Sequence, residues 1–163
     1  MKNQCETLII KTGRIRPTWE ETWFKITQVI KKRSVCLYYQ VGAVIVKDKQ
    51  FLSMGYNGPP IGISHCTDVG CAKIINGELK KHQGLCRGGH AEINAIANAA
   101  SLGVKIKGSD LFVTYRPCLM CSKAILNAGI KRVFFFKDYD GDQQAWELFQ
   151  EADIIIKKIK FKT

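Results

Sequence analysis

Apolar residues near the start of the chain recur at the spacing of one helix face: Trp19, Trp23, Ile26 and Ile30. Thr18, followed three residues later by Glu21, has the pattern of a capping box, which marks a helix start. We therefore predict an amphipathic helix over residues 18–33. Residues 1–16 form an N-terminal extension in this interpretation.

The next hydrophobic pattern predicts a β-hairpin. Residues 41–46 are an apolar run that suits a buried strand, Asp48 and Lys49 suit a turn, and residues 50–56 suit a second strand. Residues 58–88 are rich in glycine, cysteine and histidine and have weak periodicity. A segment this long without regular pattern is uncommon in a compact domain unless it is functional or held by cross-links, so we interpret it as an insertion.

Beyond the insertion the pattern becomes regular. The predicted helices cover residues 90–101, 118–128 and 143–151, and the predicted strands cover 111–115, 131–136 and 154 onward. Alternating strands and helices favour parallel strand pairing. The apolar runs 134–136 and 154–156 are interpreted as strand core. We expect a three-layer α/β/α architecture.

Length and composition favour one water-soluble domain over residues 1–163. The apolar fraction is 46% and the charged fraction 24%, which are ordinary values for a globular protein. No run is long enough for a membrane span, and the N-terminus lacks a secretory pattern, so we expect a cytoplasmic protein. The net charge of +11 fits nucleic acid or phosphorylated small molecules, but it also fits an ordinary basic surface.

Cysteine usage indicates metal chemistry. The chain has seven cysteines, an odd number, and this disfavours a disulfide framework. Cys118 and Cys121 are three residues apart at a predicted helix start, so both sulfurs can reach one ion. His90, at the start of another predicted helix, supplies a third ligand. Three protein ligands with one open position are typical of catalytic zinc.

Glu92 gives this predicted metal site its chemistry. It lies two residues from His90, close to the metal but not expected to coordinate it. A carboxylate there can carry protons between an activated water and a leaving amine. The alternatives are a closed structural zinc site, with Glu92 on the surface, and a redox pair formed by the two cysteines.

The order H-x-E…P-C-x-x-C is the pattern of zinc-dependent nucleobase deaminases. Further motifs resemble the zinc-dependent cytidine and deoxycytidylate (dCMP) deaminase family over about residues 17–156: Val41–Val46, Gly55–Pro60, Cys86–Ile96, Pro117–Cys121 and Asn127–Val133. The resemblance implies a cytidine-deaminase-like fold with a five-stranded mixed sheet. It also implies hydrolysis of dCMP to dUMP and ammonia, which supplies dUMP for thymidylate synthesis.

The resemblance also assigns individual residues. His90, Cys118 and Cys121 match the catalytic zinc ligands, and Glu92 matches the proton carrier. The substrate-contacting positions match Asn57 at the sugar hydroxyl, Tyr139 and Arg33 near the 5′-phosphate, and Ala91. Asn57 is equally well interpreted as a turn residue in a left-handed conformation, and Tyr139 and Arg33 as ordinary surface residues.

Regulation and assembly rest on the resemblance alone. Many family members are homohexamers that are activated by dCTP with Mg²⁺ and inhibited by dTTP. Residues 58–63 and the insertion lie where relatives bind the effector. No membrane partner and no obligatory nucleic-acid partner are expected.

The insertion carries candidates for a second, structural zinc. Some family members have such an ion between the insertion and the first helix, and Cys36 and Cys66 correspond to two of its ligands. Cys71 and Cys86 complete the preferred set, with His65 as the next candidate and His82 also available. The alternative is that these cysteines are buried free thiols.

Three other functions compete with dCMP deamination. A tRNA adenosine deaminase shares the zinc motifs, but generally lacks the cysteine-rich insertion. Deamination of a free base or nucleoside gives no reason for phosphate contacts. A non-catalytic, zinc-stabilised nucleic-acid-binding module has no use for Glu92.

Overall fold

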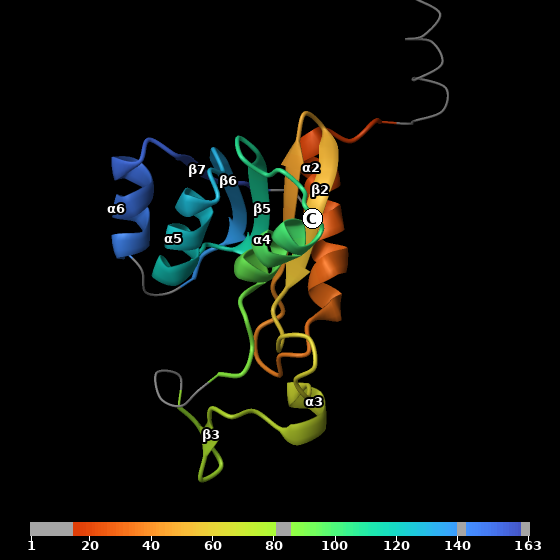
Figure 1. Ribbon diagram of the computed structural model, residues 1–163, viewed down its shortest axis with the longest axis vertical. Helices are drawn as coiled ribbons and strands as arrows, with labels where there is room; N and C mark the ends of the chain where they lie inside the picture. Colours follow the sequence, from red (N-terminus) through yellow and green to blue (C-terminus); the bar gives the residue numbers. More distant parts are fainter. Residues whose placement is uncertain (1–14, 81–85, 140–142, 161–163) are drawn as a thin grey trace, which may run out of the picture.

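A central five-stranded sheet organises the protein, seen here as a computed structural model that describes residues 15–80, 86–139 and 143–160 (Figure 1). Its strands are β1 (Gly42–Lys47), β2 (Gln50–Tyr56), β5 (Asp110–Tyr115), β6 (Arg132–Lys137) and β7 (Ile155–Lys158), in the order β2-β1-β5-β6-β7. β1 runs antiparallel to β2 and β5, whereas β5, β6 and β7 are parallel. The predicted hairpin, parallel pairing and mixed sheet are confirmed.

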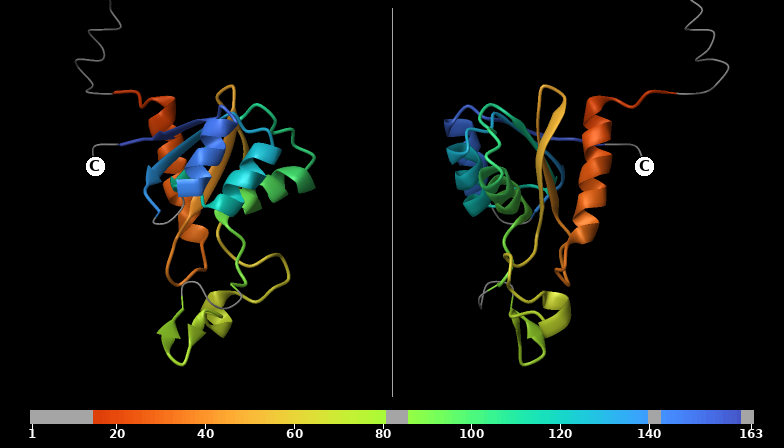
Figure 2. Two further views of the ribbon diagram at one scale, coloured as in Figure 1. Left: turned by 90° about the vertical axis from the view of Figure 1, so that its left-hand side faces the viewer. Right: turned by 45° about the vertical axis from the view of Figure 1, so that its right-hand side comes forward.

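Helices cover both faces of the sheet (Figure 2). They are α2 (Trp19–Ile30), α4 (Ala91–Ser101), α5 (Leu119–Asn127) and α6 (Gln143–Glu151). α2 packs on one face, and the other three pack on the opposite face. The expected three-layer α/β/α architecture is therefore present.

The alternation of β1 explains the three layers. Ala43 and Ile45 belong to the core cluster shared with α4, α5 and α6, whereas Val44 and Val46 belong to the cluster with Trp23 of α2. Successive side chains of a strand point to opposite faces, so an uninterrupted apolar run buries both faces at once. The apolar run in the sequence thus corresponds to a strand enclosed between two helical layers.

Two predicted elements need correction. The first helix ends at Ile30 and continues as a 3₁₀ turn, η1 (Lys31–Arg33), although its start is confirmed by the capping box of Thr18 and Glu21. The run 154–156 is only partly core, because Ile155 is 58% exposed. β7 is the last strand of the sheet, and of its four residues only Ile156 is partly buried.

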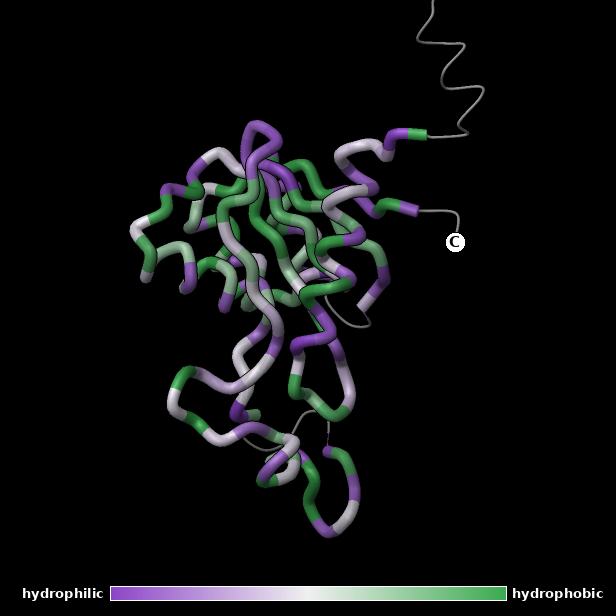
Figure 3. The backbone as a smooth tube through the Cα atoms, turned by 90° about the vertical axis from the view of Figure 1, so that its right-hand side faces the viewer, coloured by the Kyte–Doolittle hydropathy of each residue, from purple (hydrophilic) through white to green (hydrophobic). Residues whose placement is uncertain are grey.

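The insertion lies apart from the layered body (Figures 1 and 3). Within its described residues it contains the one-turn helix α3 (Cys66–Val69) and a small hairpin of β3 (Ile74–Ile75) and β4 (Glu78–Leu79). Its two ends meet at a bridge, in which Gly58 and Gly89 exchange backbone hydrogen bonds of 3.2 and 2.8 Å. Among the described residues, no helix has the length and apolar character to cross a bilayer.

Candidate active site

Close packing of α4 against β2 fixes where the helix begins. Ala91, Ala95 and Ala99 recur every four residues and are fully buried, so the helix can approach the sheet closely. Asn94 Nδ2 donates to the Tyr56 carbonyl at 2.8 Å, and Asn98 Nδ2 donates to the Met54 carbonyl at 2.9 Å. These contacts hold the helix start, with His90 as its N-cap residue, in one position.

The start of α5 is held in a similar way by β5. Gly42 donates to Thr114 Oγ1 at 3.0 Å, which ties the end of β5 to β1. The chain then passes through buried Pro117 into Cys118, the N-cap residue of α5, and Cys121 lies in the first turn. Both cysteines therefore sit at the positive end of a helix dipole, which favours thiolates.

His90, Cys118 and Cys121 form a candidate zinc site. Their ligand atoms all lie within 4.8 Å of one another. His90 Nδ1 is 3.4 Å from Cys118 Sγ and 3.3 Å from Cys121 Sγ. Zn–S and Zn–N bonds in tetrahedral geometry place sulfur and nitrogen about 3.6 Å apart, so this set fits zinc with little rearrangement.

The protonation of these groups also suits a cation. The pKa of Cys118 falls to about 4, chiefly because its sulfur accepts a hydrogen bond from Cys121. The pKa of Cys121 is raised by the same hydrogen bond and by burial, and that of His90 is raised by its hydrogen bond with Cys118. The cluster thus holds negative charge beside a proton that a metal ion can replace.

Glu92 lies in the first turn of α4, two residues after the cap residue His90, and is only 4% exposed. Burial raises the pKa of its carboxyl group, and the charge of His90 partly opposes that rise. A raised pKa brings a carboxylate closer to the operating range of a group that both accepts and returns a proton. No described residue forms a salt bridge with Glu92, and a hydrogen bond with the Cys121 side chain, which lowers the pKa of Glu92, holds the carboxyl group beside the cluster.

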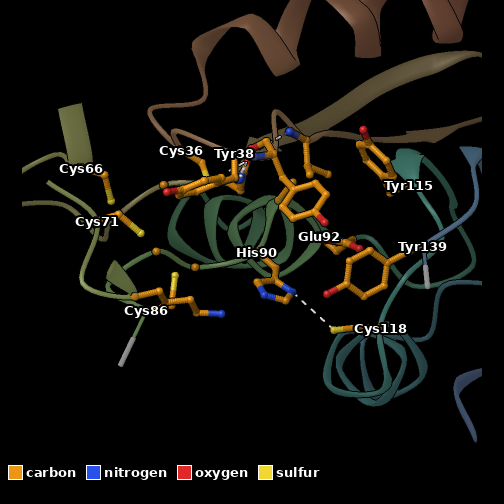
Figure 4. A pocket seen from close by; sticks show the side chains of 18 of the residues that line it. Cys36, Tyr38, Cys66, Cys71, Cys86, His90, Glu92, Tyr115, Cys118 and Tyr139 are labelled. Atoms are coloured by element: carbon orange, nitrogen blue, oxygen red, sulfur yellow. Dashed lines mark hydrogen bonds between the residues drawn. The ribbon is translucent and has the colours of Figure 1, made fainter. Parts of the chain in front are cut away.

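The adjoining space is a cavity of about 500 Å³ lined by His90, Ala91, Glu92 and Cys118 (Figure 4). That volume suits a ligand of nucleotide size. Its wall also contains Tyr38, Tyr39, Tyr115 and Arg116, which the sequence interpretation missed. These tyrosines come from two separated segments and have no shared periodicity, but Arg116 directly precedes the Pro117–Cys121 motif and could have been found.

Asn57 lines the cavity, but its amide group also holds the backbone. Asn57 Oδ1 accepts from Val41 N at 2.8 Å, and Asn57 Nδ2 donates to the Tyr39 carbonyl at 2.7 Å. Its backbone is not left-handed, so the alternative of a left-handed turn residue is wrong. The amide instead fixes the segment that carries Tyr38 and Tyr39.

The two residues expected near the phosphate are in different places. Tyr139 lines the cavity, and its ring lies 6.2 Å from that of Tyr39 in an edge contact. Arg33 lies in η1 and is not among the described residues that line the cavity. The structure therefore brings Tyr139, but not Arg33, to this site.

The four cysteines predicted for a second zinc line the same cavity: Cys36, Cys66, Cys71 and Cys86 (Figure 4). All four are free thiols. Among the described residues, only His90, Cys118 and Cys121 have ligand atoms that all lie within 4.8 Å of one another, and the four thiols are farther apart than this. His65 is the N-cap residue of α3 and does not line the cavity, and His82 falls outside the described residues.

Comparison with known proteins decides the family. Residues 17–137 match the cytidine and deoxycytidylate deaminase zinc-binding region, which covers most of the chain. The chain belongs to the cytidine and deoxycytidylate deaminase family. The resemblance inferred from the sequence motifs is confirmed, and the His90, Cys118 and Cys121 cluster lies within the matched zinc-binding region.

Individual relatives agree with this family. ComE operon protein 2 of Bacillus subtilis is 37% identical over 145 residues, covering 89% of this chain and 73% of that protein. Deoxycytidylate deaminase of Saccharomyces cerevisiae is 31% identical over 148 residues; the match covers 90% of this chain but only 46% of the yeast protein. The dCMP deaminase of cyanophage S-TIM5, solved with dCMP and dUMP, superposes with a TM-score of 0.74 at 29% identity, over 90% of this chain and 100% of that one.

Proposed function

We propose that this protein deaminates dCMP to dUMP, with Glu92 as the proton carrier and His90, Cys118 and Cys121 as zinc ligands. The observation that carries the proposal is the buried Glu92 carboxylate beside a His/Cys/Cys cluster on the wall of a nucleotide-sized cavity. The dCMP and dUMP in the cyanophage relative support the choice of substrate.

The reaction needs proton transfers that Glu92 can supply. Zinc, when bound, acidifies water so that a hydroxide nucleophile is available at neutral pH. The Glu92 carboxylate takes a proton from the attacking water and delivers one to N3 of the cytosine. It takes the second proton as the C4 carbonyl forms and delivers it to the exocyclic amine. The C4–N4 bond then breaks, and the water oxygen remains on C4 as ammonia leaves.

The direct experiment incubates zinc-loaded protein separately with dCMP, cytidine, dCTP and tRNA. We expect stoichiometric ammonia and dUMP from dCMP, and no inosine in the tRNA. Inosine without dUMP would instead identify a tRNA adenosine deaminase. Absence of dUMP with zinc and dCTP both present would refute the proposal.

We also propose a second zinc held by Cys36, Cys66, Cys71 and Cys86. The pKa of Cys66 is raised by burial and by the charges of the other three cysteines, so the four thiols are near enough to interact. Arg87 opposes that rise, and its buried Nε atom has no hydrogen-bond partner among the described residues. A cation beside these sulfurs suits the negative charge of a zinc–thiolate group.

Metal analysis tests this second site. We expect two zinc ions per chain in the wild-type protein and one in Cys66→Ser, whereas Cys118→Ser keeps the second ion. One ion in the wild type, unchanged in Cys66→Ser, would exclude the site.

Regulation and assembly are proposed from the family. We expect a homohexamer in the cytoplasm that is activated by dCTP with Mg²⁺, inhibited by dTTP, and supplies dUMP for thymidylate synthesis. The free thiols of the described cysteines fit a reducing compartment. Light scattering gives the subunit number, and initial rates with each nucleotide test the regulation; a monomer insensitive to both would contradict these expectations.

A further inference from the structure

The two ends of the cavity differ in chemistry (Figure 4). His90 lies between them. One side, the thiol end, carries Cys36, Cys66, Cys71 and Cys86. The other side, the tyrosine end, carries Tyr39, Tyr115 and Tyr139, where the ring of Tyr39 makes edge contacts with Tyr115 at 6.0 Å and Tyr139 at 6.2 Å.

Arg116 brings a guanidinium group to the tyrosine end. It lines the cavity, is half-buried, and directly follows Tyr115 in the chain. Its Nη2 atom donates to the Tyr139 carbonyl at 3.0 Å, and this is its only side-chain hydrogen bond among the described residues. An arginine side chain has five N–H donors in a planar fork, so most of its donors are available to a ligand.

The charge around the tyrosine end is positive. Asp138 is the carboxylate that lines the cavity there, and Lys158 bonds to it directly. The charges of Arg116 and Lys160 also lower the pKa of Asp138. On the other side of Arg116, Lys137 Nζ lies 5.7 Å from the centre of the Tyr115 ring. Asp138 therefore faces several cations, and an added anion beside Arg116 would be stabilised by them. The other carboxylate of the cavity wall, Glu92, lies toward Tyr115 and Tyr139 (Figure 4).

The other cation on the cavity wall is Lys73, in the insertion. Its charge lowers the pKa of His90, so it acts on the metal ligands. Lysine is a point charge, whereas the arginine fork can bind two phosphate oxygens at once. The arginine fork therefore makes the tyrosine end the favourable place for a dianion.

We infer that Arg116 binds the 5′-phosphate of the substrate and thereby makes the enzyme select nucleotides over nucleosides. The inference rests on the proposed dCMP deamination. When the cytosine ring of the substrate lies at His90 and Glu92, its phosphate lies at the tyrosine end, where Arg116 donates to the phosphate oxygens. Arg116 is thus a specificity-determining residue, and its bond to the Tyr139 carbonyl orients the guanidinium group.

The test compares dCMP with deoxycytidine, which has the same base and sugar without the phosphate. In Arg116→Gln we expect KM for dCMP to rise roughly ten- to hundredfold, the loss typical of a charged hydrogen bond, with a smaller change in kcat. The value of kcat/KM for deoxycytidine should stay within about twofold, the scale of an unperturbed site. Arg116→Lys should recover part of the preference, because it keeps the charge. Lys73→Gln is the matched control. It should leave the ratio of kcat/KM for dCMP to kcat/KM for deoxycytidine unchanged.

Several results would overturn the inference. An unchanged ratio in a folded, zinc-loaded Arg116→Gln protein would show that the phosphate binds elsewhere. Equal losses for both substrates would show that Arg116 only positions the Tyr139 segment. A ratio that falls in Lys73→Gln instead would transfer the role to the insertion. If Arg116→Gln does not fold, Arg116→Lys tests the inference instead. A KM that rises for dCMP and not for deoxycytidine supports phosphate binding by Arg116, and an unchanged KM for both contradicts it. Failure of the wild type to act on dCMP would refute the proposed function itself, and this outcome is separate from an active wild type with an unchanged ratio.

Discussion

At the residue scale, Glu92 carries the strongest prediction. Glu92→Gln keeps the shape of the side chain but cannot accept a proton, so we expect kcat to fall by about 10²–10⁴-fold with zinc retained. Glu147→Gln is the matched control, because Glu147 is an exposed glutamate on α6, away from the cavity. Metal analysis and initial rates check both variants. If Glu92→Gln turned over dCMP at the wild-type rate, Glu92 would not be the proton carrier.

The raised pKa of His90 predicts how zinc retention depends on pH. In the metal-free cluster the ring holds its proton at a higher pH than an ordinary histidine. Protons therefore compete with zinc increasingly as the pH falls through and below the usual histidine range. We expect zinc to stay bound at neutral pH and to be released by dialysis near about pH 5. Zinc content that does not change over this range would contradict the prediction.

Residue identity alone selected the candidate zinc ligands and Glu92, because their order along the chain is distinctive, and the structure brings the three ligand side chains together. Of the tyrosine end, Tyr139 was named from the resemblance, whereas Tyr39 and Tyr115 were missed, since the three rings meet only after β1, β5 and β6 have assembled. Arg33 was chosen from the resemblance, but the 3₁₀ turn that ends α2 leaves it outside the cavity wall. Local sequence carries no information on that last turn.

At the element scale, the approach of α4 to β2 depends on Gly55. A Cβ atom there would lie 2.3 Å from the Ala91 carbonyl oxygen and 2.4 Å from Ala95 N, and both are backbone atoms that cannot move away alone. We expect Gly55→Ala to lower the free energy of unfolding by about 2 kcal/mol or more, as overpacking does. It should also weaken zinc binding, because α4 carries His90.

Gly88→Ala is the control for this variant. Its added Cβ would meet backbone atoms of Gly58 at 3.6–3.7 Å, an ordinary van der Waals distance. Denaturant titration of both proteins measures the difference. Equal midpoints for Gly55→Ala and Gly88→Ala would show that α4 can shift without cost.

The elements themselves were largely predictable. Apolar runs and helical spacing identified every strand of the sheet and all four helices that cover it, with boundaries within a few residues. The insertion was not resolved into elements, because α3, β3 and β4 are too short to give a period. The prediction that residues 1–163 form a single domain stays a prediction.

At the scale of the whole molecule, the proposed zinc ligands lie at the starts of two helices that different parts of the chain supply. His90 precedes α4, and Cys118 and Cys121 begin α5, with β5 between them. Because the unfolded chain does not offer this arrangement, bound zinc stabilises the fold by mass action. We expect chelation to lower the melting temperature by several degrees, which corresponds to a few kcal/mol in a domain of this size.

Cys118→Ser separates this effect from other actions of the chelator. The variant lacks one ligand, so it should start with a lower melting temperature and respond less to chelation. Differential scanning calorimetry compares the two proteins. The same response in both would place the stabilising metal elsewhere in the chain.

The bridge between Gly58 and Gly89 makes residues 59–88 a side branch of the chain. The paired glycines hold the two ends of the branch together, so we expect a change inside the branch to leave the sheet in place. The branch nevertheless supplies Cys66, Cys71, Lys73 and Cys86 to the cavity wall. We therefore expect that this wall of the active-site cavity can be replaced, in evolution or by grafting, while the sheet and the helices that carry His90, Glu92 and Cys118 are kept.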